Sequence, residues 1–218
     1  MNIYVVAEGI CEKIIYRSWI PAVNSQLSVV DSISDVDNRK VYIFEAGGYP
    51  QLLDAIDNAI KDVRKYPQFN RLVISVDSDE LSRAEKFKEI SYYVRYKKRK
   101  LDIRIVVQHF CIETWALGNR RVVRPKSTNS KLRDYRRLFD VRAEDPELLP
   151  ALAEEELTRS QFAKKYLRLI FNDLGAGLTY SAARPFLVCP ATYFGEVKAR
   201  YEDTGHIDSF SEFLSAFS

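Results

Sequence analysis

The 218-residue chain contains few of the side chains that bind transition metals or act as nucleophiles, with three cysteines and two histidines. Cys11, Cys111 and Cys189 lie far apart and are odd in number, which indicates neither a zinc site nor a disulfide framework. His109 and His206 also lack the spacing of metal ligands, which favours structural roles for both. The Gly-x-x-x-x-Gly-Lys-Ser/Thr string is absent, which excludes ATP hydrolysis by that route.

Long apolar runs are absent too. No stretch of about 18 apolar residues occurs, so we expect no membrane span. The N-terminus has no basic region before its apolar stretch and no small-residue cleavage site, so we expect no signal peptide. The small number of cysteines makes a reducing cytoplasm the simplest setting. The formal net charge is only +3, but the charges are unevenly distributed along the chain.

Short apolar runs alternate with helical patterns through the first half of the chain. The runs predict strands at residues 3–7, 41–44, 71–76 and 102–107, with a shorter one at 27–30. The stretches between them predict helices at residues 10–24, 50–65 and 81–98. This alternation is typical of an α/β fold with a mainly parallel, Rossmann-like sheet and helices on both faces. Right-handed crossovers then bring the carboxyl ends of all strands to one edge of the sheet.

The pattern changes after residue 118. We expect a core over residues 1–118, a mostly helical and basic insertion or cap over 119–176, and a C-terminal part over 177–218 that packs back on the core. Further helices are expected at 160–174, 193–201 and 209–217.

Basic side chains are concentrated in residues 120–142, with Tyr135 and Phe139 among them. This combination is typical of a surface that contacts nucleic-acid phosphates. The candidate binding residues are Arg120, Arg121, Arg124, Lys126, Arg133, Arg136 and Arg137. The alternative is that the arginines pair with the acidic residues of segment 144–156.

Acidic side chains follow three of the predicted strands. Glu8 comes directly after the first strand and Glu12 lies one helical turn further on. Asp77 and Asp79 follow the third main strand, and Glu113 follows the fourth by a few residues. We expect these carboxylates to meet at one edge of the sheet, where they would repel one another unless a cation lies among them. Oxygen ligands favour Mg²⁺ or Mn²⁺, and two such ions could support phosphodiester hydrolysis.

Each acid also has a local explanation. Glu8 and Glu12 could simply favour a helix N-terminus through its dipole. Asp77 and Asp79 could belong to a turn and helix cap, since aspartate is favoured there. Glu113 could form an ion pair with one of the nearby arginines. All three explanations must hold independently at one sheet edge, which weakens them together.

The motifs resemble the TOPRIM domain of topoisomerases, primases and OLD-type nucleases. Val6-Ala7-Glu8-Gly9 through Glu12-Lys13, followed by Asp77-Ser78-Asp79, is most similar to the OLD-type branch. The string from Ile112 to Leu117 resembles the acid-Trp-Leu segment of small stand-alone OLD-like proteins of the RloB type. The resemblance covers roughly residues 2 to 117. It implies Mg²⁺-dependent cleavage of DNA or RNA, tRNA included, with Glu8 and Asp77 as central ligands and Glu12, Asp79 and Glu113 completing one or two metal sites.

The resemblance also implies a late lysine that stabilises charge in the transition state. The segment at residues 178–185, where we expect it, contains none, so Lys198 or Arg184 would have to take its place. OLD-type nucleases often work with an ABC-type ATPase, so the resemblance further implies such a partner encoded nearby, a role in anti-phage defence, and room for a homo-oligomer.

Two other functions stay open. A non-catalytic nucleic-acid-binding or regulatory subunit would keep the acidic edge and lack the lysine. A flavodoxin-like receiver would use Asp77 as phosphoacceptor, which leaves Asp79 and Glu113 without a role.

Overall fold

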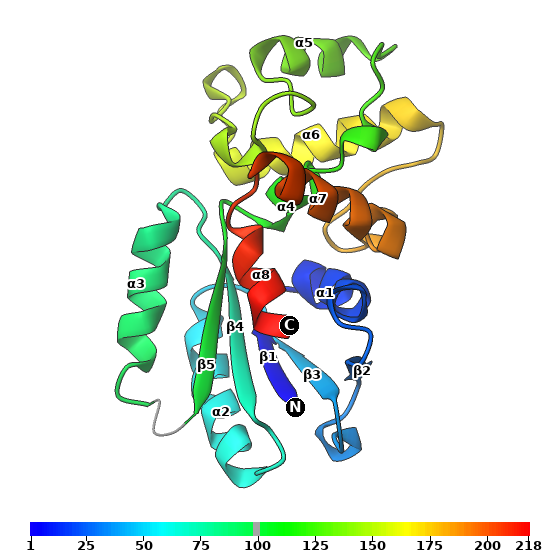
Figure 1. Cartoon of the computed structure of the whole chain (residues 1–218). Coiled ribbons are helices and arrows are strands. Elements are labelled where there is room, and N and C mark those ends of the chain that lie inside the picture. Colours follow the sequence, from blue (N-terminus) through cyan, green and yellow to red (C-terminus); the bar gives the residue numbers. More distant parts are fainter. Residues whose placement is uncertain (98–100) are drawn as a thin grey trace.

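The computed structural model describes residues 1–97 and 101–218. Within them, five strands form one parallel sheet in the order β2-β3-β1-β4-β5 (Figure 1). The strands are β1 (Ile3–Ala7), β2 (Ser28–Val30), β3 (Lys40–Glu45), β4 (Arg71–Asp77) and β5 (Asp102–Gln108). The prediction of an α/β fold with a parallel, Rossmann-like sheet is confirmed.

Helices cover both faces of this sheet. The helix pair α1 (Ile10–Val23) and α8 (Phe210–Phe217) lies on one face, and α2 (Gln51–Lys65) and α3 (Arg83–Val94) lie on the other (Figure 1). Successive residues of β1 point to opposite faces, so Val5 joins the core under α1 whereas Tyr4 and Val6 join the core under α2. Burial on both faces explains why the strands are continuous apolar runs.

The remaining helices lie beyond the carboxyl edge of the sheet (Figure 1). They are α4 (Ile112–Ala116), α5 (Ser130–Leu138), α6 (Arg159–Leu174) and α7 (Ala191–Thr204). Their apolar residues belong to the same buried cluster as the α1 face of the sheet, through large side chains such as Trp19, Trp115, Phe162 and Phe210. Residues 119–176, which include α5 and α6, therefore share one core with the sheet.

Most predicted boundaries are within a few residues of the observed ones. The helix predicted at 81–98 begins only at Arg83, because Ser82 caps it and accepts a hydrogen bond from the Glu85 N–H. Its regular part ends at Val94, and the predicted end at Lys98 lies outside the described residues. In the described part of the chain, no helix is both long and apolar enough to cross a membrane.

Candidate active site

A cavity of about 260 Å³ lies at the carboxyl edge of the sheet, beside the ends of β1 and β4. The chain leaves β1 toward β2 and β3 and leaves β4 toward β5, so the direction of the crossovers reverses between these two strands. Ligands of open α/β sheets bind at such a reversal. The charged residues that line the cavity are Glu8, Glu12, Asp77, Glu113 and Lys164.

Glu8 and Asp77 join the two central strands at their tips. The Asp77 backbone N–H donates a hydrogen bond of 3.0 Å to Glu8 Oε2. Burial raises the pKa of Glu8, and the nearby Asp79 carboxylate adds to this rise. Burial, followed by the charges of Glu12 and Glu8, raises the pKa of Asp77 well above its usual value. Asp77 Oδ1 is buried and has no hydrogen-bond partner among the described residues.

Glu12 has both a local and a cavity role. Its Oε2 accepts a hydrogen bond of 3.0 Å from the Gly9 N–H at the start of α1, so this side chain caps the helix as well as lying near the positive end of its dipole. The same side chain is buried against the cavity. Burial, then the carboxylates of Glu113 and Glu8, raises the pKa of Glu12 to about 7.

Glu113 enters the cavity from α4, which follows β5. Its Oε1 accepts a hydrogen bond of 2.8 Å from the Tyr180 hydroxyl, whose oxygen lies 3.4 Å from Cys11 Sγ. Its Oε2 is buried and finds no partner among residues 1–97 and 101–218. The predicted alternative, an ion pair with an arginine, does not form in this part of the chain. Tyr180 therefore fixes one carboxylate oxygen and leaves the other available.

Lys164, on α6, is the cavity residue that sequence reasoning missed. Its own burial lowers the pKa of the ammonium group, but the carboxylates of Glu113 and Asp77 more than offset this and raise it above the usual value. In return, Lys164 lowers the pKa of Asp77. One signal was available, because Lys164 lies four residues after Ser160 and three before Leu167, both of which are buried. A lysine on the apolar stripe of a helix has to face something polar inside.

The other predicted residues lie outside this cavity. Lys198 is on α7, where its Nζ lies 3.4 Å from Glu202, and it does not line the cavity. Arg184 is exposed, although Ala182 and Ala183 just before it line the cavity. Asp79 is exposed with a φ of 50°, and it affects the cavity through its charge on Glu8.

The donor chemistry suits a hard divalent cation. Among the described residues, no three His, Cys, Asp or Glu side chains are arranged to hold one ion together. Asp77 and Glu113 both line the cavity, and each has one buried oxygen without a partner in the described residues. Mg²⁺ commonly binds through one or two carboxylates and keeps several waters. The residues present therefore fit an ion held by Asp77 and Glu113 with water as the remaining ligand.

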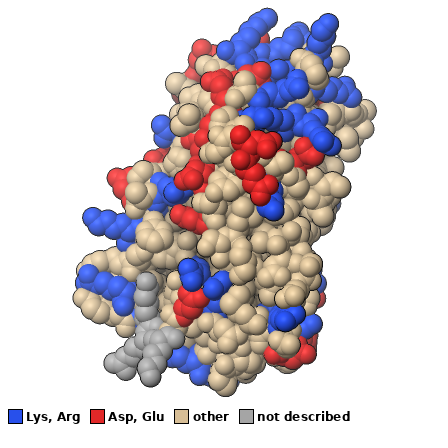
Figure 2. Space-filling model, viewed as in Figure 1, with Lys and Arg blue, Asp and Glu red and all other residues tan. Residues whose placement is uncertain are grey.

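A second charged feature lies on the helices beyond the sheet. Lys126, Arg133, Arg136 and Arg137 line a depression of about 360 Å³ together with Asp140. Figure 2 shows the lysines and arginines concentrated at this end of the molecule, over α5. Arg136 is held by Asp140 at 2.9 Å, whereas Lys126 and Arg137 are exposed. We name these four basic residues the α5 surface.

The other three predicted nucleic-acid-binding residues are partly engaged by the chain itself. Arg121 forms an ion pair of 2.9 Å with Glu196, and Arg124 donates a hydrogen bond of 2.7 Å to the Leu174 carbonyl. Arg120 Nε is buried without a partner in the described residues. From the acidic segment 144–156, Glu155 pairs with Lys131 and Lys165 and not with these arginines.

Comparisons with protein-family models, with curated proteins and with solved structures found no match to this chain.

Proposed function

We propose that the chain is a metal-dependent nuclease that hydrolyses phosphodiester bonds of DNA or RNA in the cavity at the ends of β1 and β4. The observation that carries the proposal is the meeting of four carboxylates and one lysine in a single cavity at the point where the crossovers reverse. Burying several carboxylates with only one cationic partner is unfavourable for the fold. The presence of these four carboxylates in one cavity therefore supports a role in binding.

The side chains can be given separate roles. Asp77 and Glu113 would hold Mg²⁺ or Mn²⁺ through their oxygens without partners. A bound ion supplies Lewis-acid polarisation of the phosphate and neutralises charge. Glu8 positions Asp77 by accepting a hydrogen bond from the Asp77 N–H, and its negative charge in the cavity would help to bind the cation. Lys164 would donate to a non-bridging phosphate oxygen and stabilise the charge that develops there.

The surroundings support a nucleic-acid substrate. The α5 surface carries exposed Lys126 and Arg137, which can contact phosphates without losing an internal partner that the fold needs. The resemblance to OLD-type TOPRIM nucleases supports the proposal. We further propose, from the same resemblance, an ABC-type ATPase partner, a homo-oligomer, a cytoplasmic location and a role in defence against phage. Three free cysteines support a reducing compartment.

The test replaces Glu8 with glutamine. Glu8→Gln keeps an oxygen that can accept the Asp77 N–H, so the fold should be preserved while the charge is lost. We expect cleavage of single-stranded DNA, duplex DNA or tRNA with Mg²⁺ or Mn²⁺ to fall at least about 100-fold. Glu202→Gln, on the exposed face of α7, is the matched control and should cleave normally. The assay is run with and without the ATPase partner, and undiminished cleavage by Glu8→Gln would refute the proposal.

One observation favours the second candidate, a non-catalytic binding or regulatory subunit. In the described residues no ready set of three metal ligands is formed. Mg²⁺-dependent binding of nucleic acid without cleavage, with the ATPase partner present, would identify this function.

A further inference from the structure

A second and larger cavity, of about 540 Å³, lies next to the candidate active site. Its walls come from the loop after β4, the loop after β5, residues 147–150 and the start of α6. Its lining includes Glu80, His109, Phe110, Leu148 and Arg159. None of them has a role in the proposed cleavage.

The two cavities share structural elements. Asp77 lines the first cavity, and Glu80, three residues further along, lines the second. Between them, the Asp79 N–H donates a hydrogen bond of 3.1 Å to the Phe110 carbonyl. Arg159 and Lys164 lie on the same helix, α6, about 7.5 Å apart along its axis. The two cavities are therefore lined by the end of β4 and the loop that follows it, and by the same helix.

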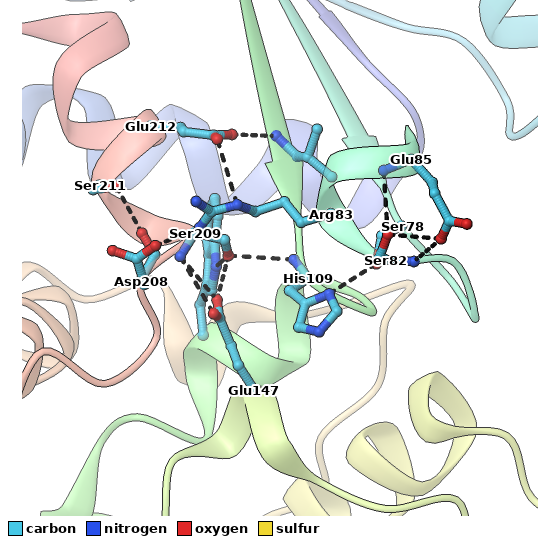
Figure 3. Close-up of polar contacts among 12 residues, drawn as sticks. Ser78, Ser82, Arg83, Glu85, His109, Glu147, Asp208, Ser209, Ser211 and Glu212 are labelled. Atoms are coloured by element: carbon cyan, nitrogen blue, oxygen red, sulfur yellow. Dashed lines mark hydrogen bonds and ion pairs between the residues drawn. The ribbon is translucent and has the colours of Figure 1, made fainter. Parts of the chain in front are cut away.

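Two rings lie in contact, tilted relative to each other, in the second cavity. The centroids of His109 and Phe110 are 3.9 Å apart, with an angle of 32° between their planes. His109 Nδ1 lies 3.2 Å from Ser78 Oγ, and Ser78 Oγ accepts a hydrogen bond of 2.9 Å from the Phe110 N–H (Figure 3). Because Ser78 Oγ already accepts one hydrogen bond, its hydroxyl can donate a hydrogen bond to His109 Nδ1. In that arrangement the neutral His109 ring carries its proton on Nε2, which is then a donor. Burial and the neighbouring Arg83 and Arg159 lower the pKa of His109, which favours the neutral ring.

A cation and an exposed leucine complete the cavity. The guanidinium of Arg159 lies 5.1 Å from the Phe110 ring centroid and is held by Glu80 at 3.2 Å. Leu148 is 72% exposed, which is unusual for a leucine that lines a concave site. The cavity therefore contains an aromatic ring, His109, and an apolar side chain, Leu148, at its edge. It also contains a hydrogen-bond donor, Arg159, paired with an acceptor, Glu80.

We propose that this cavity holds an unpaired nucleobase of the strand whose phosphate lies in the acidic cavity. The base would stack on His109 and contact Leu148 with its faces, while its edge meets Arg159 and Glu80. A base in a duplex is stacked and paired and cannot enter. The inference rests on the proposed function, and it deepens it by making the substrate single-stranded or locally unpaired.

The test measures binding of short single-stranded oligonucleotides by fluorescence anisotropy. The full chain carrying Glu8→Gln is used with Mg²⁺, so that the probe is not cleaved. The probes are one intact strand and a series in which a single abasic position is moved along it. We expect one abasic position to weaken binding about 10-fold, as expected for loss of one stacked base.

Side-chain variants identify the cavity. Leu148→Ala, which changes an exposed residue, and His109→Ala should each weaken binding of the intact strand several-fold and have little further effect on the sensitive abasic strand. Leu138→Ala, which removes a 52% exposed leucine from α5, is the matched control and should leave the intact-to-abasic ratio unchanged.

The outcomes separate this inference from the proposed function. The inference would be overturned if every abasic strand bound as tightly as the intact strand. It would also be overturned if Leu148→Ala weakened binding of the intact strand and of the sensitive abasic strand by the same factor. Both conclusions hold even if the wild-type chain cleaves. A position-specific abasic effect that depends on Leu148, in a chain that does not cleave, would support the base site and count against the nuclease.

Discussion

Lys164 offsets part of the repulsion among the buried carboxylates of the cavity. Burial raises the pKa of Asp77 and Glu12, and their mutual charge adds to the effect. A cation at this position lowers the free energy of the ionised forms, so one side chain affects both the stability of the empty site and the chemistry proposed for it.

We predict that Lys164→Met lowers the cleavage rate by about 100- to 1,000-fold, because a group that stabilises developing charge is lost. In the absence of divalent ions, the free energy of unfolding should also fall, by on the order of 1 kcal/mol, because the carboxylates lose a compensating charge. Cleavage assays and denaturant unfolding of the purified chain measure the two effects.

Two lysine variants serve as controls for Lys164→Met. Lys165→Met removes the adjacent lysine, which pairs with Glu155 outside the cavity, and Lys198→Met removes the lysine that the sequence suggested. Both should retain cleavage. If Lys198→Met lost activity and Lys164→Met kept it, the catalytic lysine would be Lys198.

Four of the five acids named from the sequence line one cavity, whereas Asp79 does not and Lys164 was not named. Glu8, Asp77 and Glu113 could be found because each follows a strand, and parallel strands end at one edge. The spacing of Lys164 indicates only that it faces inward. That Lys164 reaches the cavity and Tyr180 reaches Glu113 depends on how the helices beyond the sheet pack. Local pattern carries no information on that packing.

At the scale of elements, the chain ties its C-terminal helix to the strand that leads to the site. Ser209, just before α8, accepts a hydrogen bond of 2.7 Å from the Trp115 indole N–H and donates from its hydroxyl to Glu147 (Figure 3). Glu212 accepts a hydrogen bond of 2.9 Å from the Val107 N–H of β5, and Arg83 of α3 lies 2.8 Å from Asp208. These contacts join residues more than 60 positions apart, so no local sequence pattern predicts them.

Glu147 should make this region sensitive to pH. Burial, with a contribution from the charge of Asp145, raises the pKa of Glu147 from 4.5 to about 7, although hydrogen bonds from Ser209 and the charge of Arg83 oppose the rise. Between about pH 4.5 and pH 7 the folded chain binds more protons at this site than the unfolded chain, so the free energy of unfolding falls as pH rises.

We predict that Glu147→Gln flattens this dependence by up to about 1.4 kcal/mol per pH unit, because the variant has no proton to lose there. A glutamine oxygen can still accept the Ser209 hydrogen bonds. Urea unfolding at several pH values between 4.5 and 7 measures the difference between the two chains, and the acids of the cavity contribute equally to both. Parallel slopes would show that Glu147 is already ionised in the folded chain.

At the scale of the whole molecule, the net charge is only +3, but acidic and basic side chains are concentrated in different places. The acidic cavity lies at the edge of the sheet, whereas the α5 surface is on the helices beyond it, where Figure 2 shows lysines and arginines gathered. The fold class and the approximate limits of most elements were predictable from composition and periodicity. The strand order that brings Glu8 beside Asp77 was not, because it depends on which crossover passes over which strand.

We predict that binding of nucleic acid weakens with salt and that the double variant Lys126→Ala, Arg137→Ala reduces the slope of log K against log salt concentration. Each phosphate contact that is lost should reduce the slope by about 0.7 for single strands and 0.9 for duplexes. Anisotropy titrations at several salt concentrations measure it.

Arg17→Ala is the control for this variant, since Arg17 is an exposed arginine that pairs with Asp31 beside α1. It should leave the slope unchanged. An unchanged slope in the double variant would place the nucleic-acid contacts elsewhere on the chain.

The shared hydrophobic core has a consequence for how this molecule can be divided or recombined. A fragment that stopped at residue 118 would expose Trp115 to solvent, and it would lose Lys164 from the acidic cavity and the Tyr180 hydroxyl from Glu113. Grafting the first half of the chain onto a foreign partner would therefore transfer the carboxylates without their counter-charge. The cavity is complete only when both halves of the chain are present.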